Sequence, residues 1–217
     1  MADDLLSGDD IAQMGLADWR SMYGTLEARF VTGDFATGLR LVAAIGAVAE
    51  AAGHHPEVEL RAEHVAVVLS SHDAGGKTLR DVDLARGISA AAAELGIEAD
   101  PTLVQRPELA LDTWDVDEIR PFWAAVLQAE ARGDDEVVDP LRRTPTIWFQ
   151  RCEPHDEPHQ RWHLDLRVPP EVVRDRIAAA VAAGGTLVSD VEAPRFWVLA
   201  DSQGNKICLC THVTRPD

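Results

Sequence analysis

The chain is poor in lysine and in long apolar runs, and both shortages exclude classes of protein. Lys77 and Lys206 are the only lysines, and 37 Asp and Glu against 20 Lys and Arg give a formal net charge of −17. Nucleic-acid binding requires a basic stripe or patch, so this balance argues against it. No stretch approaches membrane-spanning length, and the N-terminus lacks the basic and apolar regions of a secretory signal. We therefore expect a cytoplasmic protein without a membrane segment.

Cysteine is also scarce, with Cys152, Cys208 and Cys210 only. The number is odd, and Cys208 and Cys210 would lie on one face of one strand, so no disulfide framework is expected. Reduced thiols fit a cytosolic setting.

The length indicates two domains. A chain of 217 residues is long for one small α+β domain, and 46% hydrophobic residues can form more than one core. The stretch from Gly96 to Pro107 holds two prolines and no clear periodicity, so the boundary is expected there. The predicted domains are 1–100 and 107–217.

The first domain is predicted to have the order αββαββα. Ser7 to Met14 favours a short helix, and Trp19 to Thr32 favours two strands. Asp34 is a typical N-cap for a long helix that Gly53 ends. Two more strands and a helix opened by Thr78 complete an α+β fold, a four-stranded antiparallel sheet with helices on one face.

Three histidines gather in the stretch from Gly53 to Asp81. Pro56 holds His55 extended, so His54 and His55 should occupy the turn between a helix and a strand. The β-branched run from Val65 ends at His72, which is followed by a glycine-containing loop. The end of a strand, a loop and the start of a helix should therefore meet near these histidines.

This stretch resembles pterin-4a-carbinolamine dehydratase. The resemblance lies in His54-His55-Pro56-Glu57 and in Ser71 to Gly76, followed by Thr78 and Asp81. Trp19, the run Leu26 to Phe30 and Asp34-Phe35 also fit, and the match covers roughly the first hundred residues. Val58 departs from it, because many members have an aromatic residue there.

The resemblance implies an enzyme that removes water from a 4a-hydroxytetrahydropterin to give quinonoid dihydropterin, in tetrahydrobiopterin recycling. Histidine suits the two proton transfers, because its pKa lies near neutrality. The resemblance places His54, His55 and His72 at the pterin, with His55 and His72 as the acid/base pair and His54 positioning the ligand. It implies no metal or organic cofactor, a pterin as the small-molecule partner, and a homodimer.

Three acidic residues accompany the histidines as candidate substrate-binding residues: Glu57, Asp73 and Asp81. Asp81 also completes a capping box with Thr78, and this structural role explains it fully. Glu57 and Asp73 orient a histidine or are simply solvated.

The second half resembles a glyoxalase-like domain of the vicinal oxygen chelate superfamily, a paired βαβββ-type fold. The resemblance lies in 109–127, with a strand from Leu109 and a helix from Asp115 to Gln128, and in 163–168 and 199–210. Strands are also predicted at Glu136 to Cys152, and a second helix begins at Pro169.

In metal-using members the ligands come from the opening and closing strands of the modules. The corresponding residues are Glu108, His163 and Cys208, which could hold zinc or iron. A packed strand histidine and a buried cysteine explain the pattern without a metal, and no fourth ligand is evident. We therefore predict no metal site.

Two alternatives to the dehydratase stay open. One is a non-catalytic pterin-binding, dimerisation or regulatory module. The other is a metal-dependent glyoxalase or dioxygenase-type activity in the second domain, which metal analysis would reveal.

Overall fold

The computed structural model describes residues 4–117, 120, 124, 129–140, 142, 145–153, 162–182, 185–200 and 206–213. Its contacts divide the chain into two units, Met1–Val104 and Gln105–Asp217. We call them unit 1 and unit 2. The mixed helix and strand content confirms the predicted α+β class.

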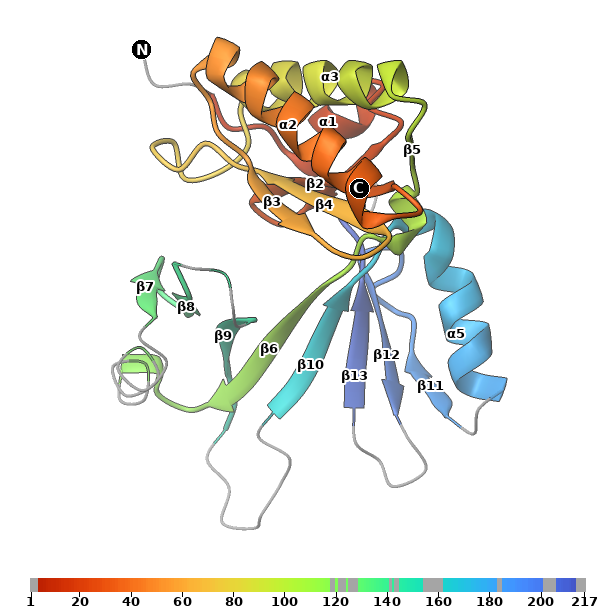
Figure 1. The fold of residues 1–217 in the computed structure, drawn as a ribbon. Coiled ribbons are helices and arrows are strands. Elements are labelled where there is room, and N and C mark those ends of the chain that lie inside the picture. Colours follow the sequence, from red (N-terminus) through yellow and green to blue (C-terminus); the bar gives the residue numbers. More distant parts are fainter. Residues whose placement is uncertain are drawn as a thin grey trace. The chain divides into compact units, whose positions relative to one another are not determined.

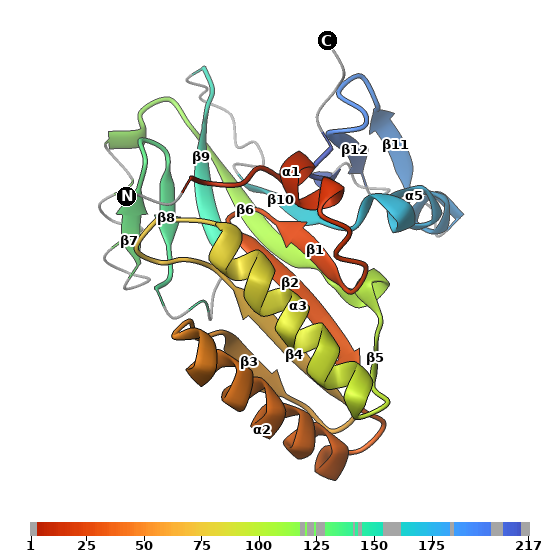
Figure 2. The same cartoon turned by 90° about the horizontal axis from the view of Figure 1, so that it is seen from above.

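Unit 1 has the predicted order αββαββα, followed by one extra strand. Its elements are α1 (Gly8–Gln13), β1 (Trp19–Met22), β2 (Thr25–Val31), α2 (Phe35–Ala52), β3 (Glu57–Leu60), β4 (His64–Leu69), α3 (Leu79–Glu94) and β5 (Glu98–Ala99). The antiparallel sheet has the order β1-β2-β4-β3, and β5 pairs with β2. In Figures 1 and 2 the helices α1, α2 and α3 cover one face of this sheet.

The core of unit 1 lies between those helices and the sheet. It includes the fully buried Phe30 and Leu41, and Trp19 meets Phe30 edge-on with ring centroids 6.1 Å apart. The indole nitrogen of Trp19 donates to Ser89 Oγ at 3.0 Å, so the buried ring is also hydrogen-bonded to α3.

Helix α2 corrects one expectation from the sequence. Phe35–Ala52 is 18 residues long and apolar enough by composition to cross a membrane. In unit 1 the same helix buries Leu41, Ile45 and Ala49 in the core. A core helix of this kind passes a test of length and hydropathy, so the signal for a membrane span is weak.

Unit 2 is built from two modules, each with its last strand parallel to its first. The described elements of the first module are β6 (Arg106–Thr113), β7 (Glu130–Arg132), β8 (Glu136–Val138) and β9 (Thr146–Arg151). The second contains β10 (Trp162–Arg167), η2 (Pro170–Val172), α5 (Val173–Ala182), β11 (Thr186–Ser189), β12 (Phe196–Ala200) and β13 (Lys206–Cys210). The predicted helix from Asp115 to Gln128 lies largely outside the described residues.

The opening strands join the two modules. The sheet has the order β11-β12-β13-β10-β6-β9-β8-β7, with β6 and β10 antiparallel at its centre. Figure 1 shows β6, β10, β13, β12 and β11 in this succession. Each module has an apolar cluster of its own, one containing Leu111 and Phe149 and the other containing Trp197 and Leu209.

The stretch between the predicted domains holds more structure than its sequence indicated. Glu98–Ala99 pairs with β2, a 3-10 helix spans Pro101–Leu103, and β6 already begins at Arg106. A two-residue strand is too short to show an alternating pattern of apolar and polar residues. The sequence pattern therefore did not reveal β5.

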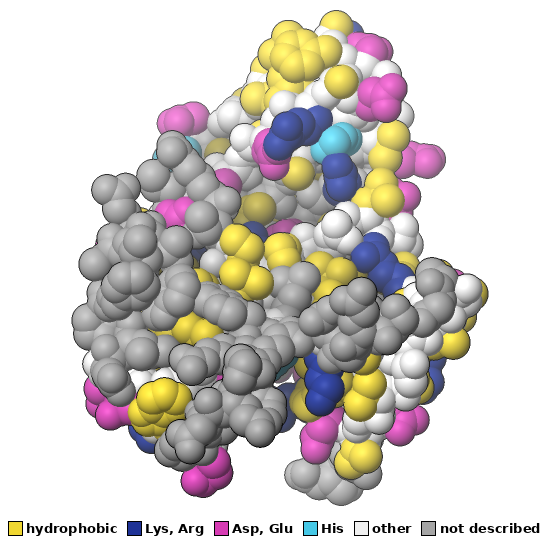
Figure 3. All heavy atoms as spheres, turned by 90° about the horizontal axis from the view of Figure 1, so that it is seen from below, with side chains coloured by type: hydrophobic (Ala, Val, Ile, Leu, Met, Phe, Trp, Pro, Cys, Tyr) yellow, Lys and Arg dark blue, Asp and Glu magenta, His cyan; other side chains and the backbone are white. Residues whose placement is uncertain are grey.

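Side chains of different type alternate on the surface. In Figure 3 the coloured acidic, basic and hydrophobic side chains are interspersed on the face shown.

Candidate functional site

The histidine site of unit 1 forms where the end of α2, the end of β4 and the start of α3 meet. Gly53 ends α2 with φ of +60°, a conformation that glycine adopts without steric cost. The next residue, His54, still donates its backbone N–H to Ala49 O at 3.2 Å. Its side chain is therefore held at a defined point beside the start of α3.

A tight loop follows β4 and places Ser71 against the same helix. Ser71 and Gly76 form a β-bridge across the loop, and the Ser71 N–H donates to Gly76 O at 2.8 Å. Gly75 has φ of +75°, so the loop needs glycine there. The fully buried side chain of Ser71 is thereby fixed next to Thr78.

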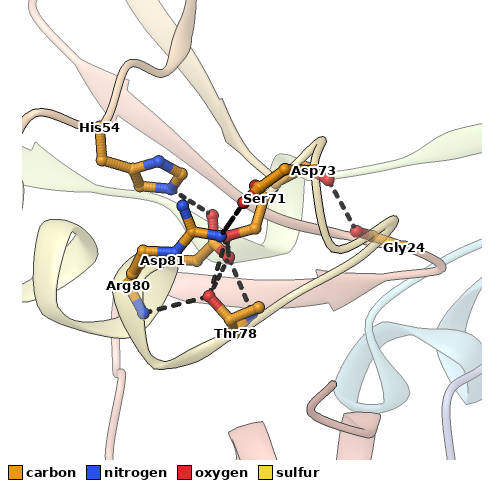
Figure 4. A network of polar contacts seen from close by, with 8 residues as sticks. Gly24, His54, Ser71, Asp73, Thr78, Arg80 and Asp81 are labelled. Carbon is orange, nitrogen blue, oxygen red and sulfur yellow. Dashed lines mark hydrogen bonds and ion pairs between the residues drawn. The ribbon is translucent and has the colours of Figure 1, made fainter. Parts of the chain in front are cut away.

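Asp81 connects these segments (Figure 4). It is fully buried at the third position of α3 and forms the predicted capping box with Thr78. Its Oδ2 accepts from the Thr78 N–H and from Ser71 Oγ, each at 2.8 Å, and Oδ1 lies 2.7 Å from His54 Nε2. Both carboxylate oxygens are thus hydrogen-bonded, as a buried carboxylate requires.

This arrangement determines what His54 can do. Its side chain is 12% exposed, and Asp81 holds Nε2. A carboxylate on one ring nitrogen fixes the orientation and tautomer of an imidazole. The other nitrogen, Nδ1, is then the atom that can serve a bound molecule.

The other two predicted histidines are exposed. The His55 side chain is 64% exposed, with Nε2 at 3.2 Å from Glu50 Oε1. His72 directly follows Ser71, so the loop keeps it near the Asp81 network. Histidines open to solvent can exchange protons with it, which acid/base chemistry needs.

The predicted acidic residues have different environments. Asp81 is the buried centre of the network, whereas Glu57 is exposed at the start of β3. Asp73 accepts hydrogen bonds from Arg80 at 2.8 and 2.9 Å, and these lower the pKa of its carboxyl. Ser71 and Thr78 belong to the motif that carries the resemblance, but the sequence pattern predicted no role for Ser71. Its position directly before His72 was the feature of the sequence that could have indicated a role at the site.

Unit 2 carries the second set of candidate residues on its central strands. Glu108 of β6 is buried, and its Oε2 accepts from Arg167 Nε at 2.5 Å. Burial raises the pKa of Glu108, and the Arg167 guanidinium opposes part of that rise. This residue is therefore already engaged by a cation of the chain.

His163 and Cys208 lie next to a further acid, Asp165. His163 Nε2 is 3.5 Å from Asp165 Oδ1, and its Nδ1 is 3.8 Å from Asp112 Oδ1. Burial and the neighbouring Asp165 raise the pKa of the Cys208 thiol to about 12. Donor atoms of His163, Asp165 and Cys208 all lie within 4.8 Å of one another.

Fold and site together define a two-part α+β protein, in which a helix-covered antiparallel sheet carries a histidine site and a paired βαβββ sheet follows. The pterin 4 alpha carbinolamine dehydratase model matches residues 4–91, and the glyoxalase-like domain model matches residues 108–210. A candidate pterin-4-alpha-carbinolamine dehydratase of Rhodopseudomonas palustris is 40% identical over 88 residues, which are 40% of this chain and 87% of that protein. The chain belongs to the pterin-4a-carbinolamine dehydratase family, with a glyoxalase-like domain as its second half. The fusion recognised in the sequence is therefore confirmed.

Other relatives match the same half. A protein of the same description from Nocardia farcinica is 39% identical over 90 residues, covering 41% of this chain and 95% of its own. A solved structure described as a transcriptional coactivator/pterin dehydratase from Brucella melitensis is 27% identical, with a TM-score of 0.39. The match spans 99% of the chain in that structure and 41% of this chain.

Proposed function

We propose that unit 1 is a 4a-hydroxytetrahydropterin dehydratase that works by histidine general acid/base catalysis. The observation that carries this proposal is the pair of His54 and the fully buried Asp81, with His55 next to His54 and His72 next to Ser71 along the chain. The capping box uses only Oδ2 of Asp81, so Oδ1 is available to orient the His54 ring toward a bound molecule. Family membership supports the same reaction class.

The reaction needs two proton transfers. An acid protonates the 4a-hydroxyl while the carbon–oxygen bond breaks, and a base takes the proton from the neighbouring ring nitrogen. The products are water and quinonoid dihydropterin. The acid loses one proton and the base gains one, so the total number of protons bound to the protein is unchanged. Each positioned transfer contributes about two to four orders of magnitude in rate.

We assign the transfers to His55 and His72 and the positioning of the pterin to His54. Exposure supports the first assignment, because both side chains can regain or release protons through solvent. Anchoring supports the second, because Asp81 fixes the His54 ring at 2.7 Å. Glu57 and Asp73 are proposed at the rim of the pterin site. Asp81 acts through His54, as a positioning residue.

The test measures the dehydration rate of a 4a-hydroxytetrahydropterin with the intact chain and with His55→Ala and His72→Ala, after subtracting the spontaneous reaction. We expect acceleration by the intact chain and a loss of about 100-fold or more in either variant. His64→Ala is the matched control, because His64 lies in the same unit and contacts Arg29. Its rate should equal that of the intact chain.

The outcomes separate catalysis from a scaffold. No acceleration by a folded chain contradicts the enzyme proposal and favours a non-catalytic pterin-binding or dimerisation module. Acceleration that survives both substitutions contradicts the assignment of His55 and His72. In that case His54 becomes the residue to test.

We further propose a role in tetrahydrobiopterin recycling, a cytoplasmic location and a homodimer formed through unit 1. The cysteines in the described part of the chain are unpaired with one another, as in a reducing compartment. Family membership supports the small-molecule pterin and an oligomer. Light scattering of the purified chain gives the oligomeric state, and a monomeric mass contradicts the dimer.

A further inference from the structure

One of the three metal ligands that the fold family implies does not fit unit 2. Glu108 would be one of them, but its carboxylate accepts from Arg167 at 2.5 Å and only 4% of its side chain is exposed. The half-buried Arg167 guanidinium already neutralises this buried carboxylate, and removing one partner of such a pair is costly. Glu108 is therefore a poor metal ligand.

The strand register offers another carboxylate. In the antiparallel pair Asp165 stands opposite Glu108, and in the parallel pair it is in register with Cys208. Residues two apart in a strand share a face, so His163 lies on the same face as Asp165. One side of the strands β10 and β13 thus presents an imidazole, a carboxylate and a thiol.

One atom in this group lacks a hydrogen bond. Asp165 is 7% exposed, and its buried Oδ1 has no hydrogen-bond partner. His163 Nε2 is 3.5 Å from that oxygen, which is long for a hydrogen bond. Leaving a buried carboxylate oxygen unsatisfied is unfavourable, and a bound cation removes the cost.

From these contacts we propose that His163, Asp165 and Cys208 bind a divalent transition metal, of which Zn²⁺ fits best. Zinc binds nitrogen, oxygen and sulfur donors, and three protein ligands leave a fourth position for an exogenous molecule. Donor atoms within 4.8 Å of one another reach a common metal with small side-chain movements. Magnesium and calcium prefer oxygen donors and are disfavoured by the thiol.

Two neighbours support His163 as a ligand. Its other ring nitrogen, Nδ1, is 3.8 Å from Asp112 Oδ1, so metal binding through Nε2 leaves Nδ1 directed at a carboxylate. This is the outer partner that metal-bound histidines usually have. The Trp148 ring packs edge-on against the imidazole, with centroids 5.8 Å apart, and restricts its rotation. This proposal concerns unit 2 and does not depend on the dehydratase proposal for unit 1.

The test loads the chelator-treated full chain with Co²⁺ and records its absorption spectrum. A cobalt–thiolate bond gives a charge-transfer band in the near ultraviolet that a carboxylate site lacks. We expect the band to saturate at one equivalent and to disappear when Zn²⁺ is added. The readout is the metal itself, so no enzyme activity is needed.

Four variants identify the ligands. Cys208→Ser should abolish the band, and Asp165→Asn should weaken Co²⁺ binding at least about tenfold, because even outer partners contribute that much. Cys210→Ser is the matched control, since this buried thiol lies on the same strand and should leave the band intact. Glu108→Gln should also retain the band. Circular dichroism confirms that each variant is folded.

Three results overturn the proposal: no thiolate band in the intact chain, a band that survives Cys208→Ser, or unchanged affinity in Asp165→Asn. Loss of the band in Glu108→Gln with retention in Asp165→Asn instead supports the ligands that the fold family implies. All of these results concern metal binding by unit 2 and do not depend on the dehydration rates measured for unit 1.

Discussion

Units 1 and 2 each place a buried carboxylate beside a histidine, but the two carboxylates differ in their hydrogen bonds. Asp81 has partners on both oxygens, with His54 Nε2 at 2.7 Å. Asp165 leaves Oδ1 without a hydrogen bond, and His163 Nε2 stands at 3.5 Å. A fully bonded carboxylate orients its histidine, whereas an incompletely bonded one is suited to receive a cation.

The surroundings explain the difference. Asp81 sits at a helix N-terminus, where backbone N–H groups need acceptors and the helix dipole favours negative charge. Asp165 lies within a sheet whose backbone groups pair with one another, so its side chain depends on neighbouring side chains. A buried acid therefore acquires its role from the element that carries it.

The strongest test of this comparison replaces each acid by its amide in the metal-free chain. Asp81→Asn turns an amide NH₂ toward either the Thr78 N–H or His54, so we expect unfolding free energy to fall by about 1 to 3 kcal/mol. Asp165→Asn removes a buried charge that lacks full hydrogen bonding and should change it by less than about 1 kcal/mol. Urea denaturation measures both values. Equal losses would contradict the distinction between the two sites.

A smaller effect is expected from the hydroxyl that supports Asp81. Ser71→Ala removes one donor from Oδ2 but leaves the Thr78 N–H in place, so we expect a loss of about 1 kcal/mol. Ser70→Ala is the matched control, because that hydroxyl donates to Gly24 O at 3.3 Å and is outside the network. A larger loss in the control than in Ser71→Ala would weaken the case for a network centred on Asp81.

The smallest effect concerns His64, a histidine that faces a cation. Burial and the neighbouring Arg29 lower the pKa of His64, with Glu59 and Glu63 acting in the opposite direction. The unfolded chain then binds a proton at higher pH than the folded one, so this contribution to stability is complete above pH of about 6.5 and declines below it. Urea midpoints at pH 7.5 and 5.5 should differ less in His64→Gln than in the intact chain. An unchanged or larger difference in the variant would contradict this.

Local sequence patterns predicted much of unit 1. The Thr78 and Asp81 capping box and the end of α2 at Gly53 each depend on neighbouring residues, and the structure has both. The contact between His54 and Asp81 spans 27 positions. It depends on how α2 packs against α3, which no local pattern specifies.

Unit 2 was harder to predict for the same reason. β7 is three exposed residues, too short for an alternating pattern to appear. Arg167 lies two residues beyond Asp165, the register partner of Glu108, so the sequence could offer Glu108 as a metal ligand without revealing its guanidinium partner. Asp165 could have been found, because a spacing of two on a strand already places it on the same face as His163.

The central pairing of β6 with β10 also bears on aggregation. Residues 106–111 pair with 162–167, so β6 lacks this neighbour until the second module has formed. Until then its backbone N–H and C=O groups are exposed along an edge that carries Leu109 and Leu111. A chain cut between the modules would present that edge permanently and could pair with other copies. We therefore expect the antiparallel pairing of β6 with β10 to limit self-association of unit 2 through this edge.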